Sequence, residues 1–386
     1  MRNAVLVSAV RTPVGKRGGV FKSLKRMDLA APVMKEALRR ASTEPYEVEE
    51  LIFGNEPEAR TPARFAWLSA GFPVEVAGLS INRASATGLT GLCLAASFIR
   101  SGFGDIYMCG GVEMDSSPSY LVRSTAPYNA GGIVISPKLS TPEKFGNPGI
   151  ITTAENIAKK LGITREECDE FAVRSHALAL KGYDEGLYAE HILPIEVKQE
   201  EYSTAVIDRD EMLRPDTNLQ TLSKLKPILP DGLVTAGNSS PFNDGAAAAI
   251  MMDEDVAKER GLKPLMRLVD FAVTGIDPRF MGLGPVRAVE KVLERNKMSA
   301  NDLDFIEINE SFAAQTLGVQ RSLGIDMDKV NIRGGGIALG HPYTATGISL
   351  AAKSAGIMKC RNSERCAIAM CANGGQGVAA IFENCD

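Results

Sequence analysis

The sequence predicts an α/β protein with two similar strand–helix halves and a long covering segment inserted between them. Three observations predict this class. Short apolar runs alternate with helix-period segments near both ends of the chain, which is typical of strand–turn–helix units. Several of these units recur in the same order, which indicates an internal duplication. At 386 residues, the chain is also too long for one hydrophobic core.

The first half alternates strands with helices. Asp28 is the expected N-cap of the first helix, whose apolar residues follow a helical stripe. A small-residue turn, Arg83 to Gly88, joins a strand to a buried helix. A polar group on such a turn lies near a helix N-terminus, where the dipole stabilises negative charge. The expected strands are 5–10, 49–54, 79–82 and 106–109, and the expected helices are 28–41 and 89–99.

The middle of the chain is predicted to cover a site on the main body. It contains long polar segments and many prolines, with expected helices at 153–161 and 164–185. Thr164 and Glu167 match a capping box at the start of the second helix. A polar loop at 235–244 and an apolar strand at 246–252 then return the chain to the core. We expect an N-terminal half at 1–115 plus 235–265, an inserted covering domain at 116–234, and a C-terminal half at 266–386.

The last third repeats the plan of the first. A helix at 285–296 and strands at 302–309 and 366–371 are expected there. Ala345-Thr346-Gly347 matches Ala86-Thr87-Gly88, and the paired glycines 374–375 match 110–111. Matching turns at strand ends face a shared cleft in open α/β sheets, so the functional site is expected between the halves.

Composition excludes several function classes. A net charge of −4 gives no reason to expect nucleic acid or a membrane surface as a partner. The seven cysteines are scattered without a CxxC motif, which favours reduced thiols in a cytoplasmic protein over disulfides or zinc. The N-terminus lacks a signal-peptide layout, and no apolar run approaches the roughly 20 residues of a membrane span. The GxGxxG and P-loop motifs are absent as well.

A glycine-rich stretch, residues 334–342, surrounds His341 and ends at Pro342. So much glycine suits a backbone that turns sharply and approaches another group closely. A surface turn with an incidental histidine is the alternative. The chain has only three histidines, and the other two, His176 and His191, are expected at the surface.

Four turns are candidates to form the expected cleft. They contain Ser85, Asn309-Glu310-Ser311-Phe312, Gly340-His341-Pro342, and the run from Cys371 to Gly377. Together they resemble the thiolase family, which splits or joins 3-oxoacyl-CoA thioesters. The resemblance covers nearly the whole chain. It implies the thiolase fold, in which duplicated mixed-sheet halves form a five-layered α-β-α-β-α core with an inserted loop domain. Further matching segments are Arg11 to Gly15, Thr153 to Asn156, Thr235 to Asn238, Asn243 to Ala246 and Gly284-Pro285.

The resemblance implies roles for five residues. Ser85 stands where the family has the nucleophilic cysteine that takes the acyl group. His341 would activate that nucleophile, and Cys371 would move the proton at the substrate Cα. Asn309 would hold a water that binds the thioester oxygen together with His341. The backbone N–H groups of Ser85 and Asn373 would form a second oxyanion hole.

Serine at position 85 departs from the family pattern. A hydroxyl is a weaker acid than a thiol, and its oxygen ester returns the acyl group to CoA reluctantly. Three explanations stay open. The serine was introduced in place of a natural cysteine, or the natural protein uses Ser85 slowly or in another acyl transfer, or the protein binds acyl-CoA without catalysis. Cys93 is close in sequence, but its place on an apolar helical stripe indicates core packing.

Two other departures concern the substrate. Gly149 and Ile150 stand where the family often has a His-Met pair along the pantetheine channel. The segment between Glu113 and Gly149 also resembles a shortened form of the one that makes tetramer contacts in biosynthetic members. Both changes favour an acyl group bulkier than acetoacetyl, for example a branched or aromatic one, and a dimer as the basic unit.

The resemblance also implies five ligand contacts. Arg214 and Thr221 would lie near the CoA nucleotide, Ser240 near the pantetheine, and Met281 and Phe312 near the acyl group. The alternatives are a solvated surface charge for Arg214 and ordinary core packing for Met281 and Phe312.

Two function classes follow from the sequence. The first is an acyl-CoA C-acyltransferase with CoA and acyl-CoA as substrates, no bound cofactor and no metal. The second is a non-catalytic acyl-CoA-binding subunit that acts with a partner protein. A homodimer or a dimer of dimers is expected in either class, and an accessory subunit stays open.

Overall fold

The computed structural model describes residues 2–55, 59–124, 133–136, 139–200 and 203–385. Its main sheet contains the strands of both halves in the order β12-β13-β14-β11-β1-β10-β5-β3-β4, and β2 pairs with β10 at one end. The strands of the first half are β1 (Ala4–Arg11), β2 (Gly15–Lys16), β3 (Glu50–Asn55), β4 (Ala77–Ser80), β5 (Ile106–Met114) and β10 (Asn243–Asp253). Those of the second are β11 (Met266–Gly275), β12 (Phe305–Ile308), β13 (Arg365–Ala372) and β14 (Gln376–Glu383).

The two halves meet edge to edge at β1 and β11. Only two residue pairs join them, Val5 with Arg267 and Leu6 with Met266, in antiparallel register. Both halves mix strand directions, because β3 pairs in parallel with β4 and β5, and β12 pairs in parallel with β13. The predicted duplication into mixed-sheet halves is therefore confirmed, and the narrow seam between them is a feature that the sequence pattern did not predict.

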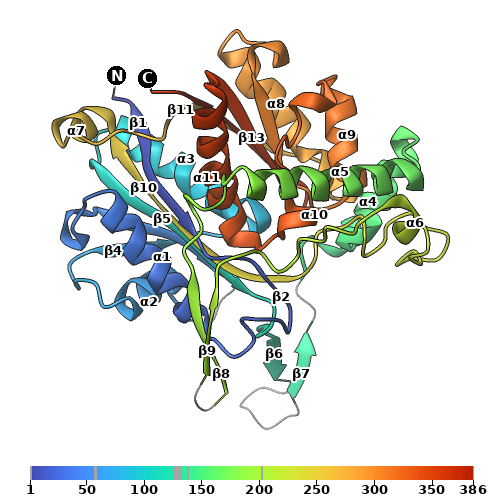
Figure 1. Ribbon diagram of the computed structural model, residues 1–386, viewed down its shortest axis with the longest axis horizontal. Coiled ribbons are helices and arrows are strands. Elements are labelled where there is room, and N and C mark those ends of the chain that lie inside the picture. The colour runs from blue at the N-terminus through green and yellow to red at the C-terminus, as the bar shows by residue number, and fades with distance from the viewer. Residues whose placement is uncertain (1, 56–58, 125–132, 137–138, 201–202, 386) are drawn as a thin grey trace.

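Helices cover the sheet in layers (Figure 1). On the outer face of the first half lie α1 (Arg26–Arg40) and α2 (Pro62–Ser69), packed over a separate apolar cluster. On the outer face of the second half lie α8 (Gly284–Arg295) and α9 (Ala313–Leu323). Between the halves lie α3 (Thr87–Arg100) and α11 (Tyr343–Arg361). The predicted five-layered α-β-α-β-α arrangement is confirmed.

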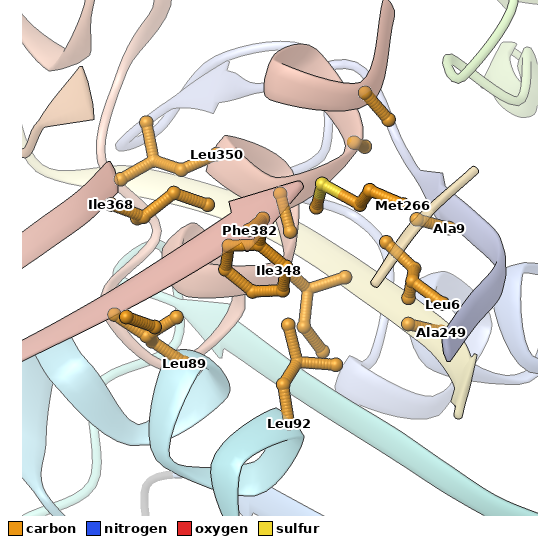
Figure 2. Packing of buried hydrophobic residues seen from close by; sticks show 14 of the residues in the cluster. Leu6, Ala9, Leu89, Leu92, Ala249, Met266, Ile348, Leu350, Ile368 and Phe382 are labelled. Atoms are coloured by element: carbon orange, nitrogen blue, oxygen red, sulfur yellow. The ribbon is translucent and has the colours of Figure 1, made fainter. Parts of the chain in front are cut away.

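The central layer is the core that holds the halves together. Figure 2 shows Leu89 and Leu92 of α3 and Ile348 and Leu350 of α11 packed toward strand residues such as Phe382. All of these side chains are buried. Removing such apolar surface from water contributes about 25 cal/mol per Å2. The same helices carry the turns that hold Ser85 and His341, so this core positions the candidate site.

Glycines let α3 and α11 touch backbone to backbone. A Cβ at Gly88 would lie 2.7 Å from the carbonyl oxygen of Thr344, and one at Gly347 would overlap the backbone nitrogen of Leu89. Neither neighbour can move without shifting a helix. The close crossing therefore fixes the N-terminal turns of the two helices relative to each other.

The segment between β5 and β10 lies over one end of the main sheet (Figure 1). It contains α4 (Ile150–Leu161), α5 (Arg165–Asp184) and α6 (Leu219–Leu222), with two hairpins made by β6 (Leu121–Ser124) and β7 (Ile133–Ser136) and by β8 (Ile195–Glu200) and β9 (Ser203–Ile207). The chain is completed by the short helices α7 (Glu254–Glu259) and α10 (Gly336–Leu339).

Helix starts test the capping predictions directly. The Thr164 hydroxyl accepts the N–H of Glu167 at 3.2 Å, and the Glu167 carboxylate accepts the N–H of Thr164 at 2.8 Å, so the predicted capping box is confirmed. The prediction that Asp28 caps α1 is wrong, because the helix begins at Arg26. Asp28 is its third residue, and its carboxylate accepts the N–H of Lys25. Within the described residues, no helix is long and apolar enough to cross a membrane.

Candidate active site

Ser85 lies on a constrained turn that leads into α3. Ala84, directly before it, has φ of 43°, a left-handed conformation that costs an L-residue roughly 1–2 kcal/mol. Side chains on both sides hold this turn. Asn82 Oδ1 accepts the N–H of Ala84 at 2.8 Å, and Thr87 Oγ1 accepts the N–H of Arg83 at 2.8 Å. The half-buried Ser85 side chain is thereby presented at the N-terminus of a buried helix.

His341 is fixed at the backbone and at both ring nitrogens. Gly340 has φ of 92°, and the N–H of His341 donates to Asn243 Oδ1 at 2.8 Å. The ring nitrogen Nδ1 lies 2.7 Å from Thr346 Oγ1, and Nε2 lies 3.2 Å from Asn309 Nδ2. Burial lowers the pKa of His341 to about 3, so the imidazole is neutral near pH 7. The alternative of a surface turn with an incidental histidine is therefore wrong.

A chain of hydrogen bonds runs from His341 to Cys371. Asn309 Nδ2 lies 3.0 Å from Ser311 Oγ, which in turn lies 3.6 Å from Cys371 Sγ. Asn309 and Cys371 are buried, and burial raises the pKa of the Cys371 thiol. Three of the turns identified in the sequence thus meet through side-chain contacts.

Glu310 ties the glycine-rich stretch to this chain. Its carboxylate accepts the Ser175 hydroxyl at 2.6 Å, the N–H of Ile337 at 3.1 Å and the Asn331 amide at 2.8 Å. A Cβ at Gly335 would collide with the Glu310 side chain, so glycine is required for this close approach. The buried carboxylate therefore anchors α10 one turn before His341.

A cavity of about 350 Å3 opens beside these turns. Six of the predicted site residues line it: Ser85, Ser240, Met281, Phe312, His341 and Asn373. Cys371 and Asn309 do not line the cavity themselves. Each of them contacts Ser311, and Ser311 does line it. Arg214 and Thr221 are exposed and lie outside the lining. The structure therefore brings eight of the ten predicted residues to one place.

The Ser85 hydroxyl and the His341 ring share the cavity without being hydrogen-bonded to each other. Within the described part of the chain, no hydrogen bond of that hydroxyl is present. A nucleophile and its base are often farther apart in a ligand-free site and approach each other when substrate binds.

Several residues of the site had no role in the sequence analysis. Ser311 was noted only as part of a motif, and Thr346 and Asn243 only as parts of matching segments, although they orient Cys371 and His341. Tyr343 packs edge-on against the His341 ring, with the ring centroids 5.0 Å apart. Thr346 follows His341 by five residues, and that spacing at a helix start was the available signal.

The other two histidines are buried, so the prediction that they lie at the surface is wrong. Side chains from distant segments enclose them. His176 accepts the N–H of Arg214 at 3.3 Å, and burial lowers the pKa of His176 to about 4. Burial lowers the pKa of His191 well below its ordinary value. Among the described residues, no group of three or more His, Cys, Asp or Glu side chains is placed to hold a metal ion.

Comparisons with known proteins agree with this geometry. The family model "Thiolase, N-terminal domain" matches residues 4–255, and "Thiolase, C-terminal domain" matches residues 262–384. Together the two models match most of the chain and correspond to its two halves. The chain belongs to the thiolase family.

Relatives cover the whole length of the chain. It is 40% identical to the β-ketoadipyl-CoA thiolase of Escherichia coli, over 99% of this chain and all of the relative. It is 39% identical to the acetyl-CoA acetyltransferase of Cupriavidus necator, with 99% and 100% covered. Among solved structures, human mitochondrial 3-ketoacyl-CoA thiolase in complex with CoA matches with a TM-score of 0.92 and 36% identity, covering 100% of this chain and 98% of that one. Relatives named for different acyl groups are equally similar, so similarity alone does not select an acyl group.

Proposed function

We propose that this chain is a thiolase-type acyl-CoA C-acyltransferase that cleaves a 3-oxoacyl-CoA with CoA or runs the reverse Claisen condensation. The observation that carries the proposal is the hydrogen-bonded series His341–Asn309–Ser311–Cys371 beside a cavity that Ser85 also lines. The series links a neutral imidazole that lines the cavity to an amide and a thiol buried beside it. Family membership supplies the reaction type.

In the proposed cleavage, the Ser85 hydroxyl attacks the 3-oxo carbonyl and His341 accepts its proton. The Cα–Cβ bond breaks, the acyl group stays on Ser85 as an ester, and Cys371 protonates the Cα of the departing acetyl-CoA. A second CoA thiol then gives its proton to the Cys371 thiolate and attacks the ester. The Ser85 oxygen leaves and takes back the proton held by His341, which restores all three groups. The backbone N–H groups of Ser85 and Asn373 would stabilise the oxyanion of each tetrahedral intermediate.

We propose an acyl group bulkier than acetoacetyl. Apolar side chains from several elements contribute to the cavity lining. The family resemblance also places Gly149 and Ile150 where members often have a His-Met pair. The large aliphatic and phenyl side chains of the lining are Ile150, Ile151, Ile228, Phe242, Met281 and Phe312. Arg214 and Thr221 are exposed near α6, which leaves them available to the nucleotide end of CoA.

The decisive experiment compares the protein with its Ser85→Cys and Ser85→Cys/His341→Ala forms. A thiolate is a better nucleophile at neutral pH, and its thioester returns the acyl group to CoA readily, so Ser85→Cys should raise kcat/KM by at least about a hundredfold, or about 3 kcal/mol. The double variant should lose that gain. Thiolysis of a series of 3-oxoacyl-CoA substrates, followed by the loss of the 3-oxoacyl-CoA absorbance, measures both effects.

A second candidate is a non-catalytic acyl-CoA-binding subunit, which the serine at position 85 favours. No turnover by the Ser85→Cys form, together with micromolar binding of acyl-CoA by calorimetry, would select this candidate. If acetoacetyl-CoA were the fastest substrate of the Ser85→Cys form, the proposal of a bulkier acyl group would be wrong. For both candidates we propose a cytoplasmic homodimer or dimer of dimers, with the division into the predicted halves and covering domain as above.

A further inference from the structure

The side chain that joins Cys371 to the rest of the site is Ser311. It lies between β12 and α9, is only 7% exposed and lines the cavity. Its Oγ is 3.0 Å from Asn309 Nδ2 and 3.6 Å from Cys371 Sγ. None of the family roles stated above falls on Ser311.

The direction of these hydrogen bonds follows from the chemistry of the groups. An amide nitrogen only donates, so Asn309 Nδ2 donates to Ser311 Oγ and to His341 Nε2. The neutral His341 ring therefore carries its hydrogen on Nδ1, which donates to Thr346 Oγ1. Ser311 Oγ accepts a hydrogen bond from Asn309, and either Ser311 or the Cys371 thiol can donate in the contact between them. Once Cys371 is a thiolate its sulfur can only accept, so in that state the Ser311 hydroxyl is the donor.

A hydrogen bond donated to sulfur favours the thiolate over the thiol. Burial raises the pKa of Cys371, while the hydrogen bond from Ser311 and one from the backbone of Cys371 act in the opposite direction. Within the described residues, no charged side chain acts on this sulfur. Glu310, next to Ser311, accepts hydrogen bonds from Ser175, Asn331 and the N–H of Ile337. Other charged groups on the surrounding elements form ion pairs with one another: Glu307 with Lys353, Asp277 with Arg279, Asp270 with Arg295, Glu383 with Arg267 and Arg365, and Glu290 and Glu294 with Arg287.

We propose that Ser311 is a positioning residue for Cys371, whose hydroxyl holds the sulfur in line with the Asn309 amide and stabilises its thiolate. This inference rests on the proposed function, in which Cys371 gives its proton to the substrate Cα. The thiolate left behind is then reprotonated by the incoming CoA thiol, whose sulfur attacks the acyl ester. Ser311 stabilises the enzyme between these two proton transfers without itself gaining or losing a proton.

The test measures the thiol titration of Cys371 without any substrate. Alkylation by iodoacetamide is followed from pH 6 to 11, and the Cys371 peptide is quantified by mass spectrometry in the native protein and in Ser311→Ala and Ser311→Thr. Hydrogen bonds to charged groups correspond to roughly one pKa unit or more, so Ser311→Ala should raise the midpoint by about one unit. Ser311→Thr keeps a hydroxyl and should restore the native midpoint.

A matched control is Ser240→Ala. Ser240 lines the same cavity, but its hydroxyl donates to the backbone oxygen of Ser311 at 3.1 Å and does not reach Cys371. Its removal should leave the midpoint unchanged. The midpoint of the pH profile reports the ionisation of the Cys371 thiol. Access of iodoacetamide to the sulfur changes only the alkylation rate reached at high pH.

The outcomes separate this proposal from the proposed function. An unchanged midpoint in Ser311→Ala overturns the proposal, even if the Ser85→Cys form cleaves 3-oxoacyl-CoA. A midpoint that rises in Ser311→Ala and is restored in Ser311→Thr supports it, even if no variant shows turnover.

Discussion

At the scale of single residues, the site depends on buried groups that stay neutral. His341, His176 and His191 are all buried, and burial lowers the pKa of each below the ordinary value of 6.5. A buried neutral imidazole accepts a proton less readily than an exposed one. It also stays unprotonated in mild acid, so the proposed base keeps the same charge across the usual assay range.

These histidines predict an acid-sensitive stability. The unfolded chain binds protons at its histidines below pH 6.5, while the folded His341 and His176 resist protonation down to about pH 3 and 4. The lowered pKa values therefore favour unfolding as the pH falls through this window, and stability is fully present above pH 6.5. Each histidine contributes up to about 1.4 kcal/mol per pH unit. Urea unfolding at pH 7.5 and 5.0 should show the loss.

His176→Gln isolates this effect from other groups. Burial raises the pKa of Asp244 and Glu307, and such carboxyl groups act in the opposite direction when the pH falls. The variant removes one lowered pKa and keeps the carboxyl groups, so its free energy of unfolding should change less between the two pH values. An identical pH dependence in both proteins would contradict the prediction.

Much of the candidate site was predictable from its residues, but the surroundings were not. Motif order identified Ser85, His341 and Cys371, because each motif contains unusual residues at a turn. The burial of His176 and His191 was missed, since it arises from contacts between segments distant in the sequence. The link through Ser311 was missed for the same reason, since a 3.6 Å contact between residues 311 and 371 has no local signal.

At the scale of elements, the crossing of α3 and α11 holds the two site turns together. Gly88 and Gly91 provide a matched pair on α3. A Cβ at Gly88 would meet backbone atoms of Thr344 and Ile348 at 2.7 and 3.2 Å, whereas one at Gly91 would have only ordinary contacts at 3.7 Å. A methyl group at Gly88 would therefore clash with α11, whereas a methyl group at Gly91 would fit.

Alanine at these two positions should therefore have opposite effects. Gly88→Ala should lower the free energy of unfolding by about 1–3 kcal/mol, because the helices must separate. Gly91→Ala should leave it unchanged or raise it by up to about 1 kcal/mol, since alanine is the better helix former. Chemical denaturation measures both. Equal losses in the two variants would mean that helix contact is not the cause.

Element positions were predicted well where local chemistry sets them. The capping box at Thr164 fixed the start of α5 to within one residue, because its two hydrogen bonds are local. The start of α1 was misplaced because Asp28 accepts a backbone N–H from inside the first turn rather than before it. A carboxylate near a helix start satisfies the same donors from either position, so the sequence alone does not separate them.

At the scale of the whole molecule, the sheet ends in an exposed strand. β4 is the last strand beside β3, and its residues are half-buried or exposed along its length. Phe65, Leu68 and Val74 are exposed nearby, at 46%, 43% and 67%. An open edge beside exposed apolar side chains favours pairing with another chain.

We therefore expect a particle of at least twice the 41.3 kDa of one chain. Light scattering coupled to size-exclusion chromatography measures this mass at micromolar concentration. Leu68→Lys should weaken the association by burying a charge, while Lys35→Ala, at an exposed position of α1, should not. A native mass of 41.3 kDa would contradict the expectation.

The overall architecture was predicted because duplication repeats every signal, so that each half supports the interpretation of the other. The seam between β1 and β11 was not predicted. Two residue pairs form it, and nothing in either strand distinguishes an edge that joins the other half from one that faces solvent.

The tight crossing of α3 and α11 also has a consequence for how such a protein diversifies. Because these helices meet backbone to backbone, moving the two halves apart to fit a larger acyl chain would break this close contact. Three of the apolar lining residues, Ile150, Ile151 and Ile228, belong instead to the segment inserted between the halves. Changes in that segment can alter which acyl chain is accepted while the reacting groups keep their places. The acyl-chain preference and the catalytic residues can therefore change independently in evolution.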